Sequence, residues 1–238
     1  NRLPELFSDE EKNARTATYS AYAQDDFPLL LSSHDAQNDF REFYSKTKQN
    51  VYVVPFVSDI ENMIRQLSPT KETETLKKYD LFGKQYTCIL KAMKVFFSAH
   101  PESELIFAFT GKLDDYRAPE YIEKLKKLFE EDVIKKHALL LGFIDRMDQI
   151  AIMKNAQFVI QPSLFEGWGT VVEDAKVLDK TILLSDIPVH REQKNDKCRL
   201  FDPHNPEMLA SIIEEETAKE HMDDFERGIL DMHRRAKE

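Results

Sequence analysis

The feature of this sequence that most constrains its fold is a regular alternation of two kinds of segment between residues 86 and 185. Short runs rich in Val, Ile, Leu and Phe, of the length of buried strands, alternate with longer segments of helical length. This alternation predicts an α/β fold with a Rossmann-like, doubly wound parallel sheet. We expect helices over residues 86–99, 119–131, 147–155 and 171–178, and strands over residues 105–110, 138–141, 158–161 and 181–185.

The remainder of the 238-residue chain shows weaker patterns. Ser8 and the acidic residues after it predict the start of a helix that continues through Tyr22. A single strand–helix–strand step follows, and it is too small to form a Rossmann-like domain by itself. We therefore expect a remnant of a second, N-terminal Rossmann-like domain at residues 1–57, a linker at 58–79, the main domain at 80–205 and C-terminal helices at 206–238.

The main domain lacks an obvious first strand. A doubly wound domain opens with a strand before its first helix, yet the segment Tyr79–Phe82 is short and mixed in polarity. Two explanations are open: the first strand is degenerate, or part of it is missing from the chain.

Composition argues against several classes of function. The net charge of −10 disfavours DNA or RNA as the main partner, because nucleic-acid binding needs a basic surface. The chain has two cysteines, its histidines show no metal-binding spacing, and no apolar run approaches the roughly 20 residues that span a bilayer. Motifs of Walker-type NTPases, serine hydrolases and dehydrogenases are absent from the sequence. We expect a cytoplasmic protein with no metal, no transmembrane segment and no nucleic-acid partner.

Candidate chemistry is concentrated in the loop that follows the expected strand at 158–161. The helix after such a loop presents backbone N–H groups and a positive dipole at the carboxyl edge of the sheet, which favours phosphate. Gly167 and Gly169 allow the backbone to come close to a ligand, and Thr170 adds a hydroxyl group. The segment thus predicts a cradle for a diphosphate. The alternative is an ordinary glycine-containing turn whose acidic residues serve the helix dipole.

Acidic residues flank these glycines. Glu166 lies in the loop, and Glu173 and Asp174 lie about one turn into the following helix. Carboxylates bind diols well, because each accepts two charge-assisted hydrogen bonds. One of these acids could therefore contact sugar hydroxyls and another the ribose, although they would repel a phosphate unless a cation lies nearby.

The string from Pro162 to Gly169, followed by Glu173–Ala175, resembles the donor-site signature of retaining glycosyltransferases of family 4, which have the GT-B fold. Further matching segments lie at residues 141–144, 153–156 and 185–193. The resemblance covers residues 86–206 well and residues 3–57 more faintly.

The resemblance implies the donor-binding half of an enzyme of polysaccharide biosynthesis. Such an enzyme moves a hexose from a nucleoside diphosphate sugar to an acceptor with retention of configuration. The acceptor would be a glycan, a lipid or a small molecule, and a missing N-terminal domain would bind it and make any peripheral contact with a membrane. GT-B enzymes bind the diphosphate with basic residues and a helix dipole, so the resemblance implies no cofactor and no metal.

The resemblance also implies roles for the acids of the loop. In the family, two glutamates separated by seven residues contact the sugar and the ribose, and Glu166 matches the first, catalytic one. The spacing leads from there to Asp174, whereas Glu173 stands one place early. We prefer Asp174 as the ribose contact on register. Trp168 either flanks the sugar or packs the loop, and we favour packing.

Cations for the diphosphate form a second group. Lys84 matches the lysine of the family's catalytic basic pair, which neutralises the charge that develops on the leaving group, but its companion has no match in this chain. Lys112 follows Gly111 at the end of an expected strand, where this fold meets its ligands, and is a second candidate. Both lysines also have a plain interpretation as solvated surface residues.

The turn after the expected strand at 138–141 matches the family segment that holds the nucleobase. Ile144 would contact the base through its backbone, and Arg146 would stack on the base or reach a phosphate. Later in the chain, His190 could line the cleft, and Glu192 resembles a further donor-side acid of the family. Single residues after a strand are also often structural.

Two other functions stay open. The missing companion of Lys84 favours a non-catalytic, glycosyltransferase-like binding subunit. A sugar-nucleotide epimerase of the GT-B type would share the donor fold, but it would need an acid–base pair from a first domain.

Overall fold

The structure is a computed structural model that describes residues 8–24, 27–47, 49–67, 86–111 and 119–219. The segment Tyr79–Phe82, where the first strand of the main domain was expected, and the candidate cations Lys84 and Lys112 lie outside these described residues.

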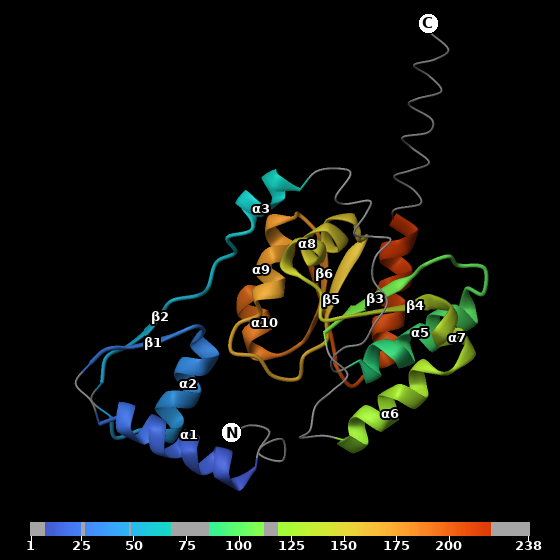
Figure 1. The fold of residues 1–238 in the computed structure, drawn as a ribbon. Helices are drawn as coiled ribbons and strands as arrows, with labels where there is room; N and C mark the ends of the chain where they lie inside the picture. Colours follow the sequence, from blue (N-terminus) through green and yellow to red (C-terminus); the bar gives the residue numbers. More distant parts are fainter. Residues whose placement is uncertain (1–7, 25–26, 48, 68–85, 112–118, 220–238) are drawn as a thin grey trace, which may run out of the picture.

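The N-terminal part contains the predicted helix and the predicted strand–helix–strand step (Figure 1). Ser8 caps the first helix with a reciprocal pair of hydrogen bonds to Glu11, as its sequence predicted. The two short strands pair in parallel, with Leu30 opposite Tyr52. The elements are α1 (Asp9–Tyr22), β1 (Leu29–Leu31), α2 (His34–Phe43), β2 (Val51–Val53) and α3 (Glu61–Gln66).

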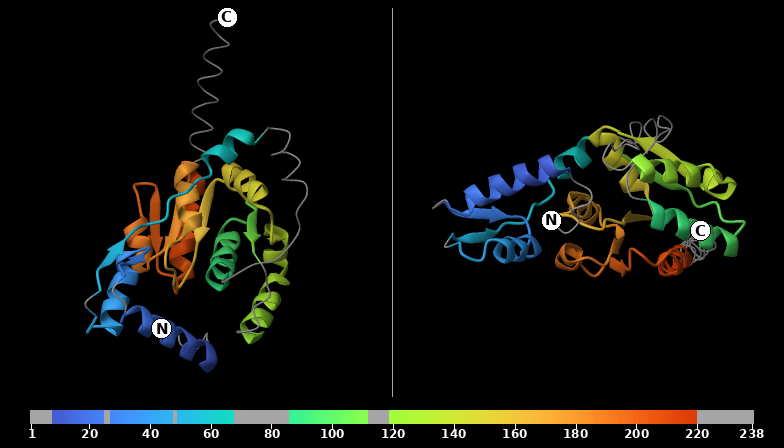
Figure 2. Two further views of the ribbon diagram at one scale, coloured as in Figure 1. Left: turned by 60° about the vertical axis from the view of Figure 1, so that its left-hand side comes forward. Right: turned by 90° about the horizontal axis from the view of Figure 1, so that it is seen from below.

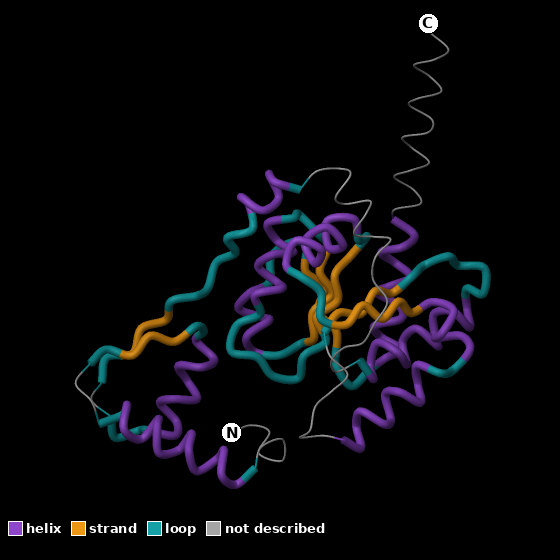
Figure 3. The backbone as a smooth tube through the Cα atoms, in the orientation of Figure 1, coloured by secondary structure: helices purple, strands orange, loops and turns teal. Residues whose placement is uncertain are grey.

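The main part is an α/β unit in which every described strand pairs in parallel, which confirms the predicted fold class. Figure 3 shows its strands gathered at the centre with helices around them. The strands are β3 (Phe107–Thr110), β4 (Ala138–Gly142), β5 (Phe158–Gln161), β6 (Thr181–Ser185) and β7 (Cys198–Phe201). The helices are α5 (Thr87–Ala99), α6 (Pro119–Phe129), α7 (Asp132–His137), α8 (Arg146–Asn155), α9 (Thr170–Val177), α10 (Pro188–Gln193) and a last one at 206–219.

The strands of the main part form two separate ladders among the described residues. One pairs β3 with β4, and the other has the order β5–β6–β7. In the common Rossmann order, the first strand of a domain lies between its second and its fourth strand. If the first strand precedes α5, then β3 is the second strand of this domain and β5 the fourth. The division therefore falls at the position where the sequence lacks a clear first strand.

Buried side chains of α5, of β3 and of the helix at 206–219 build the larger core. On α5, the apolar residues Ile89, Leu90, Met93 and Phe97 repeat at helical spacing and turn one face inward. Strand β6 lies between β5 and β7, and its residues from Ile182 to Ser185 are buried, as expected for a central parallel strand. This rigid centre carries the loop that bears the candidate chemistry.

The N-terminal part lies beside α9 and α10, on the side of the main part that bears the candidate loop (Figures 1 and 2). Helix α2 contacts α10 there. Further along the chain, Ile60 and Leu67, which flank α3, pack with Ile150 and Ala151 of α8 in a small apolar cluster. The two parts therefore meet where α2 contacts α10 and again at this apolar cluster.

Candidate functional site

The loop between β5 and α9 opens onto a cavity of about 2700 Å³. Residues of β3 and β5, Glu166 and Gly167 of the loop, and residues of α1 and α2 line it. Its volume exceeds the roughly 300–1,000 Å³ of a small-ligand pocket, because the cavity also takes in the space between the two strand ladders. The predicted donor site thus lies at a hollow beside the carboxyl end of β5, where open α/β sheets bind ligands.

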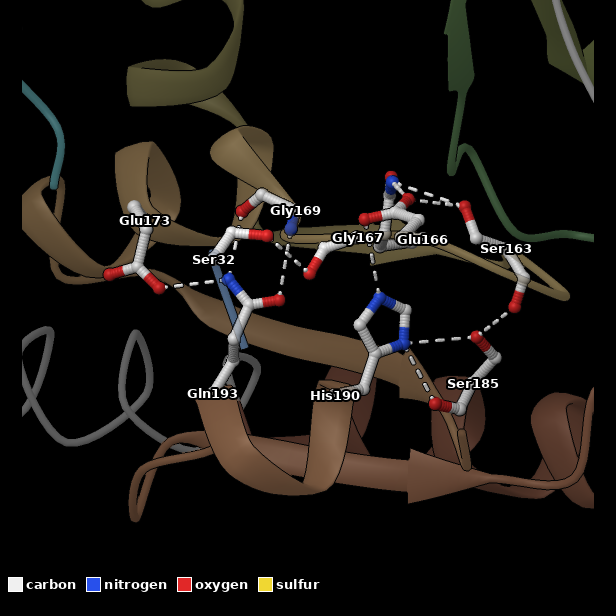
Figure 4. Close-up of polar contacts among 10 residues, drawn as sticks. Ser32, Ser163, Glu166, Gly167, Gly169, Glu173, Ser185, His190 and Gln193 are labelled. Carbon is white, nitrogen blue, oxygen red and sulfur yellow. Dashed lines mark hydrogen bonds and ion pairs between the residues drawn. The ribbon is translucent and has the colours of Figure 1, made fainter. Parts of the chain in front are cut away.

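Glu166 is held at the cavity edge by groups of its own loop and of the elements behind it (Figure 4). Its Oε1 accepts hydrogen bonds from Gln161 Nε2 and Ser163 Oγ, and its Oε2 lies 3.7 Å from His190 Nε2. Burial opposes ionisation of this carboxyl, but the contacts with His190, Ser163 and Gln161 outweigh burial and hold the pKa of Glu166 below its ordinary value. The carboxylate is therefore ionised at neutral pH and fixed in one orientation.

His190 lies beneath Glu166 and is completely buried. Of the two alternatives, lining the cleft or a structural role, the structure supports the structural one, because the loop covers the ring. Its Nδ1 lies 2.8 Å from the Ser185 carbonyl oxygen. Ser185 Oγ in turn donates a hydrogen bond of 2.5 Å to the carbonyl of Ser163, which ties the end of β6 to the loop.

Gly169 is required by packing inside the loop. A Cβ atom at this position would lie 2.6 Å from Glu166 Oε2 and 3.0 Å from a methyl group of Val172. The Gly169 N–H donates to Gln193 Oε1 at 3.1 Å, and Gln193 Nε2 donates back to the Gly169 carbonyl at 3.0 Å. The close approach that we predicted for a ligand is made here by Glu166 and Gln193 instead.

Gly167 and Trp168 connect the loop to the N-terminal part. Ser32 Oγ, next to β1, donates to the Gly167 carbonyl at 3.1 Å. The indole Nε1 of Trp168 donates to the Phe56 carbonyl at 3.0 Å. Trp168 thus packs the loop, the role that the sequence favoured, and it does so against residues more than a hundred positions earlier.

Asp174 and Arg146, which we predicted to contact the ribose and the base, bind each other. Arg146 Nη2 lies 2.7 Å from Asp174 Oδ2, and Ser58 Oγ donates to the other oxygen of Asp174 at 2.7 Å. Glu173 accepts a hydrogen bond of 2.9 Å from Gln193. None of Arg146, Glu173 and Asp174 lines the cavity in this structure. Which acid contacts the ribose stays a prediction.

The remaining predicted contacts lie along the carboxyl edge of the sheet. Gly111 and Gly142 end neighbouring strands with φ values of 106° and 58°, which glycine adopts readily, and the Gly111 N–H donates to the Gly142 carbonyl. Ile144 is 9% exposed, and Thr170 is exposed at the N-terminus of α9. The structure therefore brings Gly111 and Ile144 to neighbouring strand ends, as predicted, while their ligand contacts stay predictions.

Glu192 connects α10 to the N-terminal part in this structure. Its two carboxylate oxygens accept hydrogen bonds of 2.8 and 2.7 Å from the backbone N–H groups of His34 and Asp35. These groups open α2, so Glu192 satisfies the N-terminus of that helix. A donor-side role of Glu192 stays a prediction.

Sequence reasoning missed Ser163, Ser185 and Gln193 as parts of the site. All three lie in segments that resemble the family, but their contacts join residues up to 24 positions apart, so their role in holding the loop could not be inferred. A further signal was the polar Ser185, which follows the apolar residues 182–184 at the end of β6. Among the described residues, no cluster of three metal-ligating side chains occurs, and no helix is long and apolar enough to span a membrane.

Comparison with known proteins decides the family. Residues 59–227, well over half of the chain, match the family described as Glycosyl transferases group 1. The chain belongs to this family. This confirms the resemblance that the loop sequence indicated.

This group 1 family member is also similar to known glycosyltransferases. It is 28% identical over 102 residues to the O-antigen biosynthesis glycosyltransferase WclY of Escherichia coli, a match that covers 38% of this chain and 29% of that protein. Similar solved structures are a glycosyltransferase from Rickettsia africae, with TM-score 0.67 and 15% identity, and Anabaena HepE in complex with UDP and glucose, with TM-score 0.67 and 18% identity.

These similarities define the fold and the extent of the chain. The two structural matches cover 85% and 88% of this group 1 family member but only 57% and 58% of the solved chains. The chain therefore spans somewhat more than half the length of those proteins. At such identities the likeness shows the fold alone, and that fold is GT-B.

Proposed function

We propose that this chain is the donor-binding part of a retaining glycosyltransferase that takes a sugar from a nucleoside diphosphate sugar. The observation that carries the proposal is Glu166, an ionised carboxylate fixed at the cavity edge in the loop that matches the family's donor signature. The structural neighbour HepE holds UDP and glucose, which is consistent with a donor of this class. Since the WclY relative is named for O-antigen biosynthesis, we propose a saccharide acceptor.

In this proposal, Glu166 accepts hydrogen bonds from hydroxyls of the donor sugar. The diphosphate lies at the N-terminus of α9, where Thr170 is exposed and Val171 lines the cavity, because the helix dipole favours negative charge there. Lys84 and Lys112 are the proposed cations for the diphosphate, and the turn at Ile144 is the proposed contact of the base. Stabilising the leaving diphosphate supplies the catalysis.

The test is thermal unfolding of the full chain with UDP, GDP, UDP-glucose, UDP-GlcNAc and GDP-mannose. A ligand at 100 times its Kd stabilises a protein by about 2.7 kcal/mol. We expect one nucleotide family to raise the melting temperature, with a further increase when the sugar is attached. Glu166→Ala should remove the further increase and keep the nucleotide effect.

The matched control is Glu207→Ala, at an exposed glutamate on the helix at 206–219, which should leave both effects unchanged. If no nucleotide and no nucleotide sugar stabilises the chain, the proposed donor site is wrong. Binding without transfer or hydrolysis of the donor would instead indicate a non-catalytic binding subunit.

A further inference from the structure

Two buried polar atoms face each other behind the loop between β5 and α9, residues 162–169, which we call the donor loop. His190 Nε2 and Glu166 Oε2 are both inaccessible to solvent, lie 3.7 Å apart, and have no hydrogen-bond partner among the described residues. Buried polar atoms in this condition are uncommon and costly. The pair is also confined, because a Cβ atom on Gly169 would meet the same Oε2 at 2.6 Å.

The hydrogen bonds of His190 fix which ring nitrogen carries a proton. Nδ1 lies 2.8 Å from the Ser185 carbonyl oxygen, which can only accept, so Nδ1 is an N–H donor. In a neutral imidazole, Nε2 would then carry a lone pair and point it at the lone pairs of a carboxylate. That arrangement is repulsive, whereas a proton between the two atoms turns it into a charge-assisted contact.

We propose that His190 is a positioning residue of the donor site, which carries a proton on Nε2 and holds the Glu166 carboxylate in place for the sugar as an ion pair. This proposal rests on the proposed function and adds the group that holds its central acid in place. No atom of His190 contacts the donor, because the loop covers the ring.

The proton completes a closed circuit of contacts (Figure 4). Ser163 Oγ donates to Glu166 Oε1, Ser185 Oγ donates to the Ser163 carbonyl, and His190 Nδ1 donates to the Ser185 carbonyl. His190 Nε2 then returns to Glu166 Oε2. The circuit joins the loop after β5, the end of β6 and α10, so the orientation of one carboxylate is set by three separate elements.

The proton on His190 also changes the charge of the site. An ionised carboxylate near the diphosphate would repel it. With Nε2 protonated, Glu166 and His190 together carry no net charge, since a carboxylate and an imidazolium cancel. The site can therefore present Glu166 Oε1 to sugar hydroxyls without weakening the binding of the diphosphate.

The first test reads the proton directly and needs no ligand. Nitrogen NMR of the full chain, with histidine labelled in the ring, distinguishes a ring with protons on both nitrogens from a neutral ring with a bare Nε2. We expect a proton on Nε2 of His190 at neutral pH and its loss in Glu166→Gln, where the carboxylate is gone. A bare Nε2 in the unaltered chain would overturn the proposal.

The second test separates positioning from plain structural support. His190→Leu removes the donor to Glu166, and His190→Gln keeps an N–H group on a side chain that can reach the same oxygen. We expect His190→Leu to weaken binding of the nucleotide sugar about 10- to 100-fold, the range for a lost charge-assisted hydrogen bond, with little change for the nucleoside diphosphate alone. His190→Gln should recover part of the loss.

Equal losses for nucleotide and nucleotide sugar in both variants would mean that His190 only supports the fold, which would overturn the proposal. Failure of the unaltered chain to bind any nucleotide would overturn the proposed function, while the NMR experiment would still decide whether Nε2 of His190 carries a proton. If a variant does not fold, the NMR result on the unaltered chain stands alone as the test.

Discussion

The two strand–helix–strand regions of this molecule are built alike but held differently. In the region around β5, α9 and β6, the strands are covered by helices, and β6 is buried from Ile182 to Ser185. In the region of β1, α2 and β2, the outward residues Leu30 and Tyr52 are 62% and 53% exposed. Parallel sheets are normally covered on both faces. The N-terminal region therefore lacks a complete core of its own.

What the N-terminal region lacks in apolar burial is partly replaced by polar contacts to the donor loop and to α10. Glu192 of α10 satisfies the first N–H groups of α2, and Ser32 and Trp168 make further hydrogen bonds between the two parts. The main part is therefore stabilised from within, whereas the N-terminal part depends on contacts with the loop and α10. Changes at these contacts should reach the N-terminal part.

The largest effect that would test this contrast comes from a matched pair of leucines. Leu184 of β6 is completely buried, whereas Leu30 of β1 is 62% exposed. We expect Leu184→Ala to lower the free energy of unfolding by about 2–5 kcal/mol, from lost burial and the cavity left behind. Leu30→Ala should change it by less than about 0.5 kcal/mol. Urea denaturation measures both, and similar losses at the two sites would contradict the contrast.

A smaller effect is expected at the buried carboxylate of α9. Asp174 is 1% exposed and is held by Arg146 and Ser58. Asp174→Ala should cost about 1–3 kcal/mol, because it leaves their hydrogen-bonding groups without a partner. The control is Asp179→Asn, at a side chain that is 81% exposed in its ion pair with Lys197; it should cost about 0–1 kcal/mol, because Asn tolerates the φ of 57° at this position. Equal costs in urea denaturation would show that Asp174 is no structural anchor.

The contact between the two parts can be weakened on its own. Glu192→Gln removes the charge at the N-terminus of α2 and should destabilise that helix by about 0.5–2 kcal/mol. Hydrogen exchange should therefore speed up in α2 and stay unchanged in β6. Arg191→Ala, at the exposed neighbour that pairs with Asp186, is the control and should leave α2 unchanged. Faster exchange throughout the chain would argue against local coupling.

The same contrast between covered and exposed strands explains which strands could be predicted from the sequence. The strands β3 to β6 were predictable because their apolar runs alternate with amphipathic helices. Strand β7 was missed, since Cys198–Phe201 includes the charged Arg199 and follows a polar stretch. The ends of β1 and β2 do not follow from the sequence, because apolar residues near them, such as Phe27 and Val57, are exposed rather than paired.

In the site, the sequence indicated Glu166 and its loop but not the groups that hold them. The loop motif is local, so it can be recognised in one chain. The contacts of Gln193 with Gly169 and of His190 with Glu166 cross 24 positions and depend on how α10 lies under the loop. The pairing of Asp174 with Arg146 likewise depends on how α8 and α9 pack together. Such contacts follow from tertiary packing, which no spacing rule describes.

The smallest expected effect is a pH dependence of the free energy of unfolding that comes from Glu166. Its pKa lies below the ordinary value of 4.5, but burial opposes the contacts with His190, Ser163 and Gln161, so the net stabilisation is modest. A lowered pKa in the folded state contributes stability above the unfolded value, and this contribution disappears as the pH falls through the folded value. The stability of the unaltered chain relative to Glu166→Gln should therefore be greatest from about pH 5 upward, judged from the unfolded value, and should shrink toward lower pH. Urea denaturation across this range measures the difference, with Glu207→Gln as an exposed control. A difference that grows as the pH falls would mean that burial prevails over the hydrogen bonds and that the carboxyl is not held as the anion.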